Sequence, residues 1–248
     1  MTRCAAVSTA NLPDFRAAPN QGGNIDLYEI ENRALDPEGH VQAALRARAA
    51  WAGRTLLDLG CGSGFWLGRY ADEAGEVIGV EPDPRLLPLA AARDSRVRVL
   101  HGSAEHIPLE DQSVDVVHAR FAYFFPPGCE AGLTEVMRVL RPGGTLIAIG
   151  NDLRAGEFAE LVRAAGAALV PAGGEETDAW WAARGADRIT VRSSWRFTSR
   201  ADFEAVLRME FPLKVADPWL AAHPGALGLG YSYALFAIDK PSGLLRAR

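Results

Sequence analysis

An acidic residue followed by closely spaced glycines is the clearest chemical feature of this chain. Asp58 precedes Gly60, Gly62 and Gly64 in the segment LLDLGCGSGFW (56–66). Glycine permits positive φ and lets a ligand come close to the backbone. The apolar run before the glycines predicts a strand, and the pattern after them predicts a helix with free N–H groups at its start. The segment therefore has the form of a ligand-binding loop between a strand and a helix.

Charge around this loop indicates what the ligand carries. The glycine spacing is G-x-G-x-G, and the carboxylate of Asp58 would repel a pyrophosphate but attract an ammonium or a sulfonium. The second predicted strand ends at Glu81, where an acidic residue accepts hydrogen bonds from both hydroxyls of a ribose. A ligand with a ribose and a positive charge matches S-adenosylmethionine.

Alternating strands and helices must hold these residues in place. Short apolar runs, most of them with β-branched residues, predict strands at 55–59, 77–80, 97–101, 114–117, 145–150, 189–197 and 231–239. Helical patterns fall near 24–51 (two helices), 64–73, 84–93, 128–140, 155–169 and 199–211. This alternation predicts an α/β fold, with a mostly parallel sheet and helices on both of its faces.

The two ends of this pattern differ from its middle. Residues 1–23 contain proline, glycine and asparagine without periodicity, and we expect a flexible N-terminal arm there. Residues 24–248 are expected to form a single domain. Segments near 24–50, 171–188 and 212–230 are expected to supply a small lid.

Composition restricts the partners and the compartment. The chain has 248 residues, a net charge of −5 and no basic cluster, which argues against a nucleic-acid substrate. Cys4, Cys61 and Cys129 are far apart and odd in number, as is usual in a reducing cytosol. Without a metal-ligand cluster, a signal peptide or an apolar run of about 18 residues, we expect a cytoplasmic protein with no metal and no membrane insertion. It would act on a small molecule as a monomer or homodimer.

Residues 54–152 resemble the class I S-adenosylmethionine-dependent methyltransferases, in particular the small-molecule enzymes related to those of menaquinone and ubiquinone biosynthesis. The similarity rests on LLDLGCGSG, VIGVEPDPRLL, HGSAEHIPLEDQSVDVVHARFAYFF and VLRPGGTLIAIG. It implies a Rossmann-like sheet of seven strands in the order 3-2-1-4-5-7-6, with the last strand antiparallel. It also implies one methyltransferase domain, with the cofactor at the carboxyl ends of the strands.

The resemblance further implies which residues contact the cofactor. Asp58 would lie near the methionine ammonium, Glu81 would hold the ribose, and His118 would lie where the fourth strand passes the methionine end. The other implied contacts are Gly60, Cys61, Gly62, Pro82, Leu86, Ser103, Ala104 and Glu105. Gly64 of the same loop and Tyr28 are further candidates, with Tyr28 either closing over the methionine carboxylate or packing in the lid. Ser103 is a departure, because the family commonly has an aspartate there that accepts from the adenine amino group. A hydroxyl is the weaker acceptor, and Glu105 is an alternative.

Methyl transfer from a sulfonium is an in-line displacement that depends mainly on positioning the acceptor. A general base is needed only for a protonated, weakly acidic acceptor, so the catalytic residues stay unknown, with His118 as the candidate base. Candidate acceptor contacts are Arg120, Tyr123, Phe124, Trp180 and Trp181, with packing as the alternative for the aromatic ones. Such a pocket suits an apolar or planar small molecule.

Two other functions would leave different signatures in the sequence. A nucleic-acid amino-methyltransferase would carry an Asn/Asp-Pro-Pro-Tyr/Phe motif where this chain has HARFAYFFPPG. A nicotinamide-dependent reductase would need a Tyr-x-x-x-Lys pair, but Glu210 and Phe236 stand four residues before Lys214 and Lys240, the two lysines of the chain. A non-catalytic regulator or partner subunit that binds S-adenosylmethionine remains the alternative, and binding without turnover would distinguish it.

Overall fold

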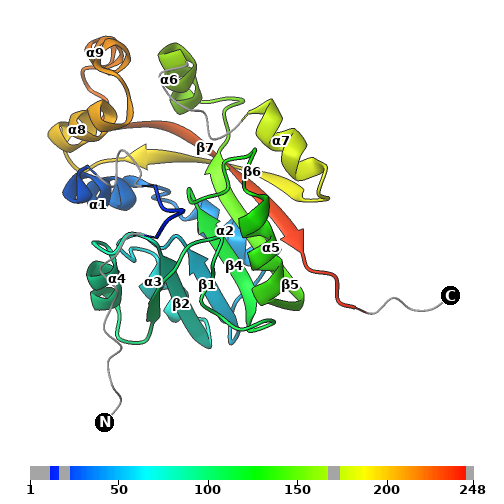
Figure 1. The fold of residues 1–248 in the computed structure, drawn as a ribbon. Coiled ribbons are helices and arrows are strands. Elements are labelled where there is room, and N and C mark those ends of the chain that lie inside the picture. The colour runs from blue at the N-terminus through cyan, green and yellow to red at the C-terminus, as the bar shows by residue number, and fades with distance from the viewer. Residues whose placement is uncertain (1–11, 17–22, 167–173, 244–248) are drawn as a thin grey trace. The chain divides into compact units, whose positions relative to one another are not determined.

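A computed structural model describes residues 12–16, 23–166 and 174–243 (Figure 1). Most of the predicted N-terminal arm, at 1–11 and 17–22, lies outside the described residues, as do residues 171–173 of the predicted lid. Of the helices in the described part, none combines the length and the apolarity that a membrane crossing requires.

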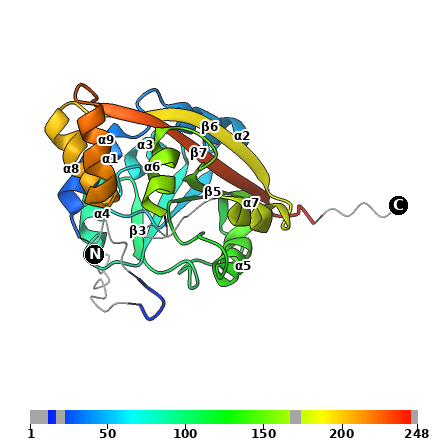
Figure 2. The same cartoon turned by 90° about the horizontal axis from the view of Figure 1, so that it is seen from above.

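Seven strands form one sheet in the order β3-β2-β1-β4-β5-β7-β6, which confirms the predicted topology. The strands are β1 (Thr55–Leu59), β2 (Glu76–Glu81), β3 (Arg98–His101), β4 (Val114–Arg120), β5 (Leu140–Asn151), β6 (Asp187–Arg196) and β7 (Gly228–Asp239). β1 is parallel to β2 and β4, and β2 is parallel to β3. β6 and β7 lie side by side in both views (Figures 1 and 2).

β7 is antiparallel to β5, as predicted. Just beyond β7, the Lys240 N–H donates to the Gly144 carbonyl (2.8 Å), and the Gly143 N–H donates back to the Lys240 carbonyl (2.9 Å). This reciprocal pair of hydrogen bonds is typical of antiparallel strands.

The first of two compact units comprises Met1–Arg16, Ala49–Ala148 and Ala237–Arg248. Its helices are α3 (Leu67–Ala71), which packs on β2, α4 (Leu87–Arg93), which packs on β3, and α5 (Glu130–Val139). Strands β1, β2 and β4 are buried almost throughout. This burial explains why they read as continuous apolar runs rather than as alternating ones.

The second unit comprises Ala17–Arg48 and Ile149–Phe236. Its helices are α1 (Ile25–Ala34), α2 (His40–Arg48), α6 (Glu157–Ala165), α7 (Glu175–Ala182), α8 (Arg200–Glu210) and α9 (Leu213–Ala222). Phe158 packs its ring against Trp195, Phe211 and Tyr231, with centroids 4.3 to 5.2 Å apart. Most of the segments predicted to form a lid fall in this unit, and their action as a lid stays a prediction.

Strand register in the first unit brings the predicted site residues to one edge of the sheet. Asp58 is paired with Gly79 on one side and with His118 on the other. Glu81 ends β2 and is paired with His101 at the end of β3. The carboxyl ends of neighbouring parallel strands meet at the edge where ligands bind in folds of this type.

Candidate functional site

The side chain of Glu81 holds the glycine loop in place. Its Oε2 accepts from the Gly62 N–H (2.8 Å), and its Oε1 accepts from the Asp83 N–H (2.9 Å). The Gly60 and Cys61 N–H groups both donate to the Val80 carbonyl, at 2.8 and 3.1 Å. The loop after β1 is therefore tied to the end of β2 by the carboxylate and by the backbone.

The conformations of the loop glycines agree with the prediction from sequence. Gly60, Gly62 and Gly64 have φ of +73°, +59° and +79°, a region that side chains rarely adopt. A Cβ on Gly60 would lie 2.5 Å from the Ala122 Cβ, and one on Gly64 would lie 2.8 Å from the Ala90 Cα. Both positions thus require glycine for packing as well as for backbone conformation.

Two buried carboxyl groups face this loop. Burial raises the pKa of Asp58 to about 7, against the opposing effect of the Arg120 charge. Burial also raises the pKa of Glu81 to about 7, although the Asp83 and Gly62 N–H groups lower it. A ligand that brings positive charge and hydroxyl donors would stabilise both groups in their ionised form.

The loop that follows β4 has an unusual backbone. Phe121 and Tyr123 have φ of +48° and +57°, which are uncommon values for residues other than glycine. They flank Ala122, the residue that lies against Gly60. Backbone conformations of this kind cluster at functional sites.

Tyr123 is fixed by its hydroxyl. The Oη donates to Glu105 Oε1 (3.0 Å) and accepts from the Gly132 N–H (3.1 Å) near the start of α5. Glu105, implied as a cofactor contact, thus positions Tyr123, a candidate acceptor contact. Sequence reasoning placed both residues near the site but missed this contact between them.

His118, the candidate base, is enclosed. Its ring meets Trp51 and Tyr70 edge-on at 5.4 and 5.2 Å, and none of its surface is exposed. In the described part of the chain, neither ring nitrogen has a hydrogen-bond partner. Burial lowers the pKa of His118 to about 3, and the charge of Arg120 adds to the effect. A group with so low a pKa is a poor general base near neutral pH.

We expect His118→Phe to make the protein relatively more stable in acid. The folded state keeps the imidazole neutral, whereas the unfolded chain takes up a proton below about pH 6.5. The wild-type protein therefore loses folding stability progressively as the pH falls from about 6.5 towards 3, because only its unfolded state gains a proton at His118. The difference in the free energy of unfolding between the variant and the wild type should shift in favour of the variant by about 2 kcal/mol between roughly pH 7 and pH 5. Urea unfolding at the two pH values measures the change, and a constant difference between the proteins would contradict it.

Arg120 lies against aromatic side chains in the first unit. Its Cζ is 4.1 Å from the Trp66 ring centroid, and its NH2 group donates to the Tyr70 hydroxyl at 3.5 Å. Phe124, another candidate acceptor contact, is buried, and its ring meets that of Tyr123 edge-on at 5.4 Å.

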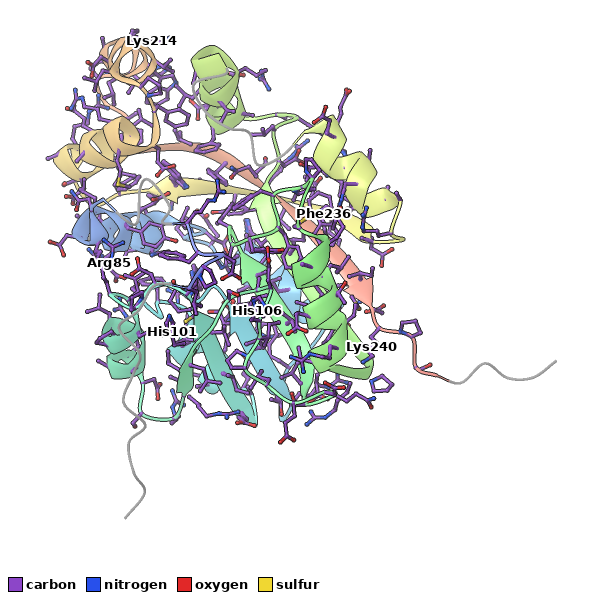
Figure 3. All side chains as sticks on the ribbon, viewed as in Figure 1. Arg85, His101, His106, Lys214, Phe236 and Lys240 are labelled. Carbon is purple, nitrogen blue, oxygen red and sulfur yellow. The ribbon has the colours of Figure 1, made fainter. Side chains whose placement is uncertain are left out.

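Three predicted site residues belong to the second unit. Trp181 is buried and stacks on Phe236, which is labelled in Figure 3, at 5.4 Å with an interplanar angle of 9°. The Arg184 guanidinium lies over the Trp180 ring, with its Cζ 3.6 Å from the ring centroid. Tyr28 lies on α1. The two tryptophans thus have packing partners within their own unit, and the predicted roles of all three residues stay predictions.

The residues implied for the adenine side gather after β2 and β3. Leu86, Ser103 and Ala104 are buried, and the Pro82 carbonyl contacts His101 Nε2 at 3.1 Å. Sequence reasoning missed Asp14, whose carboxylate accepts from the Ser103 hydroxyl. Because 89 positions separate these two residues, no local pattern could have revealed the contact.

Among the described residues, no group of three or more His, Cys, Asp or Glu side chains is placed to hold a metal ion. The thiols of Cys61 and Cys129 are buried.

Comparisons with known proteins agree with this geometry. A family profile described as "Methyltransferase domain" matches residues 57–148. An uncharacterized methyltransferase of Mycobacterium bovis is 39% identical over 142 residues, which cover 56% of this chain and 56% of that protein. A protein of Mycolicibacterium smegmatis, named a probable S-adenosylmethionine-dependent methyltransferase, is 40% identical over 97 residues, or 39% of this chain and 37% of that one.

Among solved structures, a SAM-dependent methyltransferase from Aquifex aeolicus superposes with a TM-score of 0.55. The match covers 90% of this chain and 98% of that one at 16% sequence identity, and it shows a shared fold. The sequence matches span 56% and 37% of the length of these two curated relatives. None of these three names specifies a methyl acceptor.

Proposed function

We propose, since this chain contains a class I S-adenosylmethionine-dependent methyltransferase domain, that the protein transfers a methyl group from S-adenosylmethionine to a small molecule. The observation that carries the proposal is the pair of buried carboxyl groups, Asp58 and Glu81, on either side of a glycine loop. A cytoplasmic location belongs to the same proposal, and the thiols of Cys61 and Cys129 support it.

The residues present fit the proposed cofactor. The glycine loop offers backbone without side chains beside the ends of β1 and β2, and Asp58 offers a buried negative charge for the methionine ammonium. Glu81 already accepts from Gly62 and Asp83, and each of its oxygens has a further lone pair for a ribose hydroxyl. The bound cofactor would supply the electrophilic methyl group.

The chain's own contribution is then mainly to orient the reactants. The neutral, enclosed His118 favours a packing role over that of a base. The aromatic segment after β4, which includes Tyr123 and Phe124, supports an acceptor with an apolar or planar surface. A mechanism based on positioning needs no further catalytic side chain.

Calorimetry with S-adenosylhomocysteine tests the proposed cofactor site, and we expect saturable binding to the full chain. Turnover is then followed as S-adenosylhomocysteine formed from S-adenosylmethionine with a panel of small aromatic and aliphatic acceptors. Binding with no turnover on a broad panel would favour the non-catalytic regulator or partner subunit instead. A protein that fails to bind would contradict the proposal.

We expect the affinity for S-adenosylhomocysteine to rise with pH between about 5.5 and 7.5. Below pH 7, Asp58 and Glu81 increasingly take up protons, and a neutral Asp58 cannot pair with the ligand's ammonium. The dissociation constant should therefore increase by up to about tenfold for each pH unit of acidification per linked group. Calorimetry across this range measures the trend, and Asp58→Asn should remove the share of Asp58 and leave the weaker pH dependence that comes from Glu81. A dissociation constant that does not change with pH would contradict the assignment of Asp58.

A further inference from the structure

The hydroxyl of Ser103 takes part in a small network with the N-terminal segment. Its Oγ donates to Asp14 Oδ2 and accepts from the His106 N–H at 3.2 Å. The imidazole of His106, which is labelled in Figure 3, places Nδ1 3.5 Å from the same Asp14 oxygen. Ser103 is buried and the side chain of Asp14 is 15% exposed, so the contact is largely shielded from water.

These contacts restrict what the hydroxyl of Ser103 can offer a ligand. A serine hydroxyl has one proton and two lone pairs. The proton points to Asp14 and one lone pair faces the His106 N–H, so one lone pair is left. Burial alone would raise the pKa of Asp14, but hydrogen bonds from Ser103 and His106 lower it below its usual value. An ionised Asp14 accepts only, and it keeps the Ser103 proton directed to itself.

The position of Ser103 relates this network to the proposed cofactor. The ammonium is assigned to Asp58 on β1 and the ribose to Glu81 on β2, so the ligand crosses the strand ends in that direction. The next strand is β3, where His101 is paired with Glu81, and the Gly102 N–H donates to the Glu81 carbonyl at 3.3 Å. Ser103 follows directly, and the base of the nucleoside comes next after the ribose.

We infer that Asp14 makes Ser103 an obligatory hydrogen-bond acceptor for the 6-amino group of the cofactor's adenine, and thereby selects 6-amino over 6-oxo purines. This inference rests on the proposed function. Asp14 is a positioning residue, because it acts on the base through Ser103. The charge of Asp14, in the N-terminal segment, thus supplies the acceptor strength that a neutral serine hydroxyl lacks on its own. A 6-oxo purine would place the lone pairs of its carbonyl against the remaining lone pair of Ser103. Neither oxygen would then receive a hydrogen bond, and an acceptor without a donor is costly in a buried site.

The test compares two ligands that differ only at position 6 of the purine. Calorimetry on the full chain measures the dissociation constants of S-adenosylhomocysteine and S-inosylhomocysteine. The wild-type protein should prefer the adenosyl ligand by roughly tenfold or more. In Asp14→Ala the Ser103 proton becomes available to a 6-oxo group, and the preference should fall to within about threefold. Asp14→Glu should restore part of it.

Two more variants separate this role from simple packing. Asp72→Ala removes an exposed carboxylate that pairs with Arg96 in the same unit, and it should leave the ligand preference unchanged. Ser103→Ala removes the acceptor itself and should abolish the preference for the adenosyl ligand. This variant keeps the inference testable if Asp14→Ala does not fold. Loss of packing by the N-terminal segment would weaken both ligands equally, so the ratio of the two constants is the decisive quantity.

The outcomes also distinguish the inference from the function on which it rests. Equal affinity of the wild-type protein for the two ligands would overturn the inference and leave the cofactor site standing. A wild-type preference that persists in both Asp14→Ala and Ser103→Ala would do the same. Failure of the wild-type protein to bind either ligand would overturn the proposed function, and this inference with it.

Discussion

Glu81→Ala is expected to weaken the binding of S-adenosylhomocysteine roughly 100-fold, measured by calorimetry near pH 7.5. Two effects add in this variant. The proposed ribose loses two hydrogen bonds to a charged acceptor, at about 1.5 kcal/mol or more each. The glycine loop also loses its attachment, because the Gly62 N–H donates to the same carboxylate.

Two further variants make the Glu81 experiment specific. Glu81→Gln keeps the size of the side chain but has a single acceptor oxygen, so its amide group must face the N–H of Gly62 or of Asp83. It should therefore bind weakly as well. Glu76→Ala removes an exposed carboxylate at the start of the same strand, where it pairs with Arg98, and should bind like the wild type. Wild-type affinity in Glu81→Ala would refute the assignment of this residue.

Gly60→Ala is expected to lower both folding stability and cofactor affinity. The new Cβ would lie 2.5 Å from the Ala122 Cβ, and the residue would have to keep a φ of +73°. The left-handed backbone costs about 1 kcal/mol and the overpacking a further 1 to 3 kcal/mol. Relief of this clash moves the loop away from the ligand, so binding should weaken together with the melting temperature.

A matched glycine separates the two contributions at Gly60. Gly53 has a similar φ of +68°, but a Cβ there would meet nothing within 4 Å. Gly53→Ala should therefore show the backbone penalty alone, with no loss of binding. The double variant Gly60→Ala/Ala122→Gly removes the opposing methyl group. It should recover the share of the stability loss that comes from packing, which Gly53→Ala does not show. Equal destabilisation by Gly60→Ala and Gly53→Ala would contradict the packing argument.

The strands of the first unit were predictable because each is a buried run between turn residues. β1 has the predicted bounds, β2 extends one residue beyond the predicted range at each end, and β3 begins one residue later than predicted. β4 continues three residues beyond the predicted Val117, since His118 and Arg120 interrupt the apolar pattern that marked the strand. β5 begins at Leu140 rather than at Thr145, because the letters RPGG are typical of a turn.

Other features follow from tertiary packing that no local pattern encodes. Helices α7 and α9 lie in segments whose periodicity is weak, and α9 contains Pro218, which ordinarily argues against a helix interior. The positive φ of Phe121 and Tyr123 has no signature in their residue types. The contact of Asp14 with Ser103 depends on how a distant segment folds back.

The close approach of Ala122 to Gly60 also limits how this protein can be redesigned. A side chain larger than alanine at position 122 would extend towards the backbone of the glycine loop, because the Ala122 Cβ already lies 2.5 Å from the place that a Cβ on Gly60 would take. Libraries aimed at the proposed acceptor should therefore keep Ala122 constant. The segment after β4 thus contains one position, Ala122, where the glycine loop limits the size of the side chain.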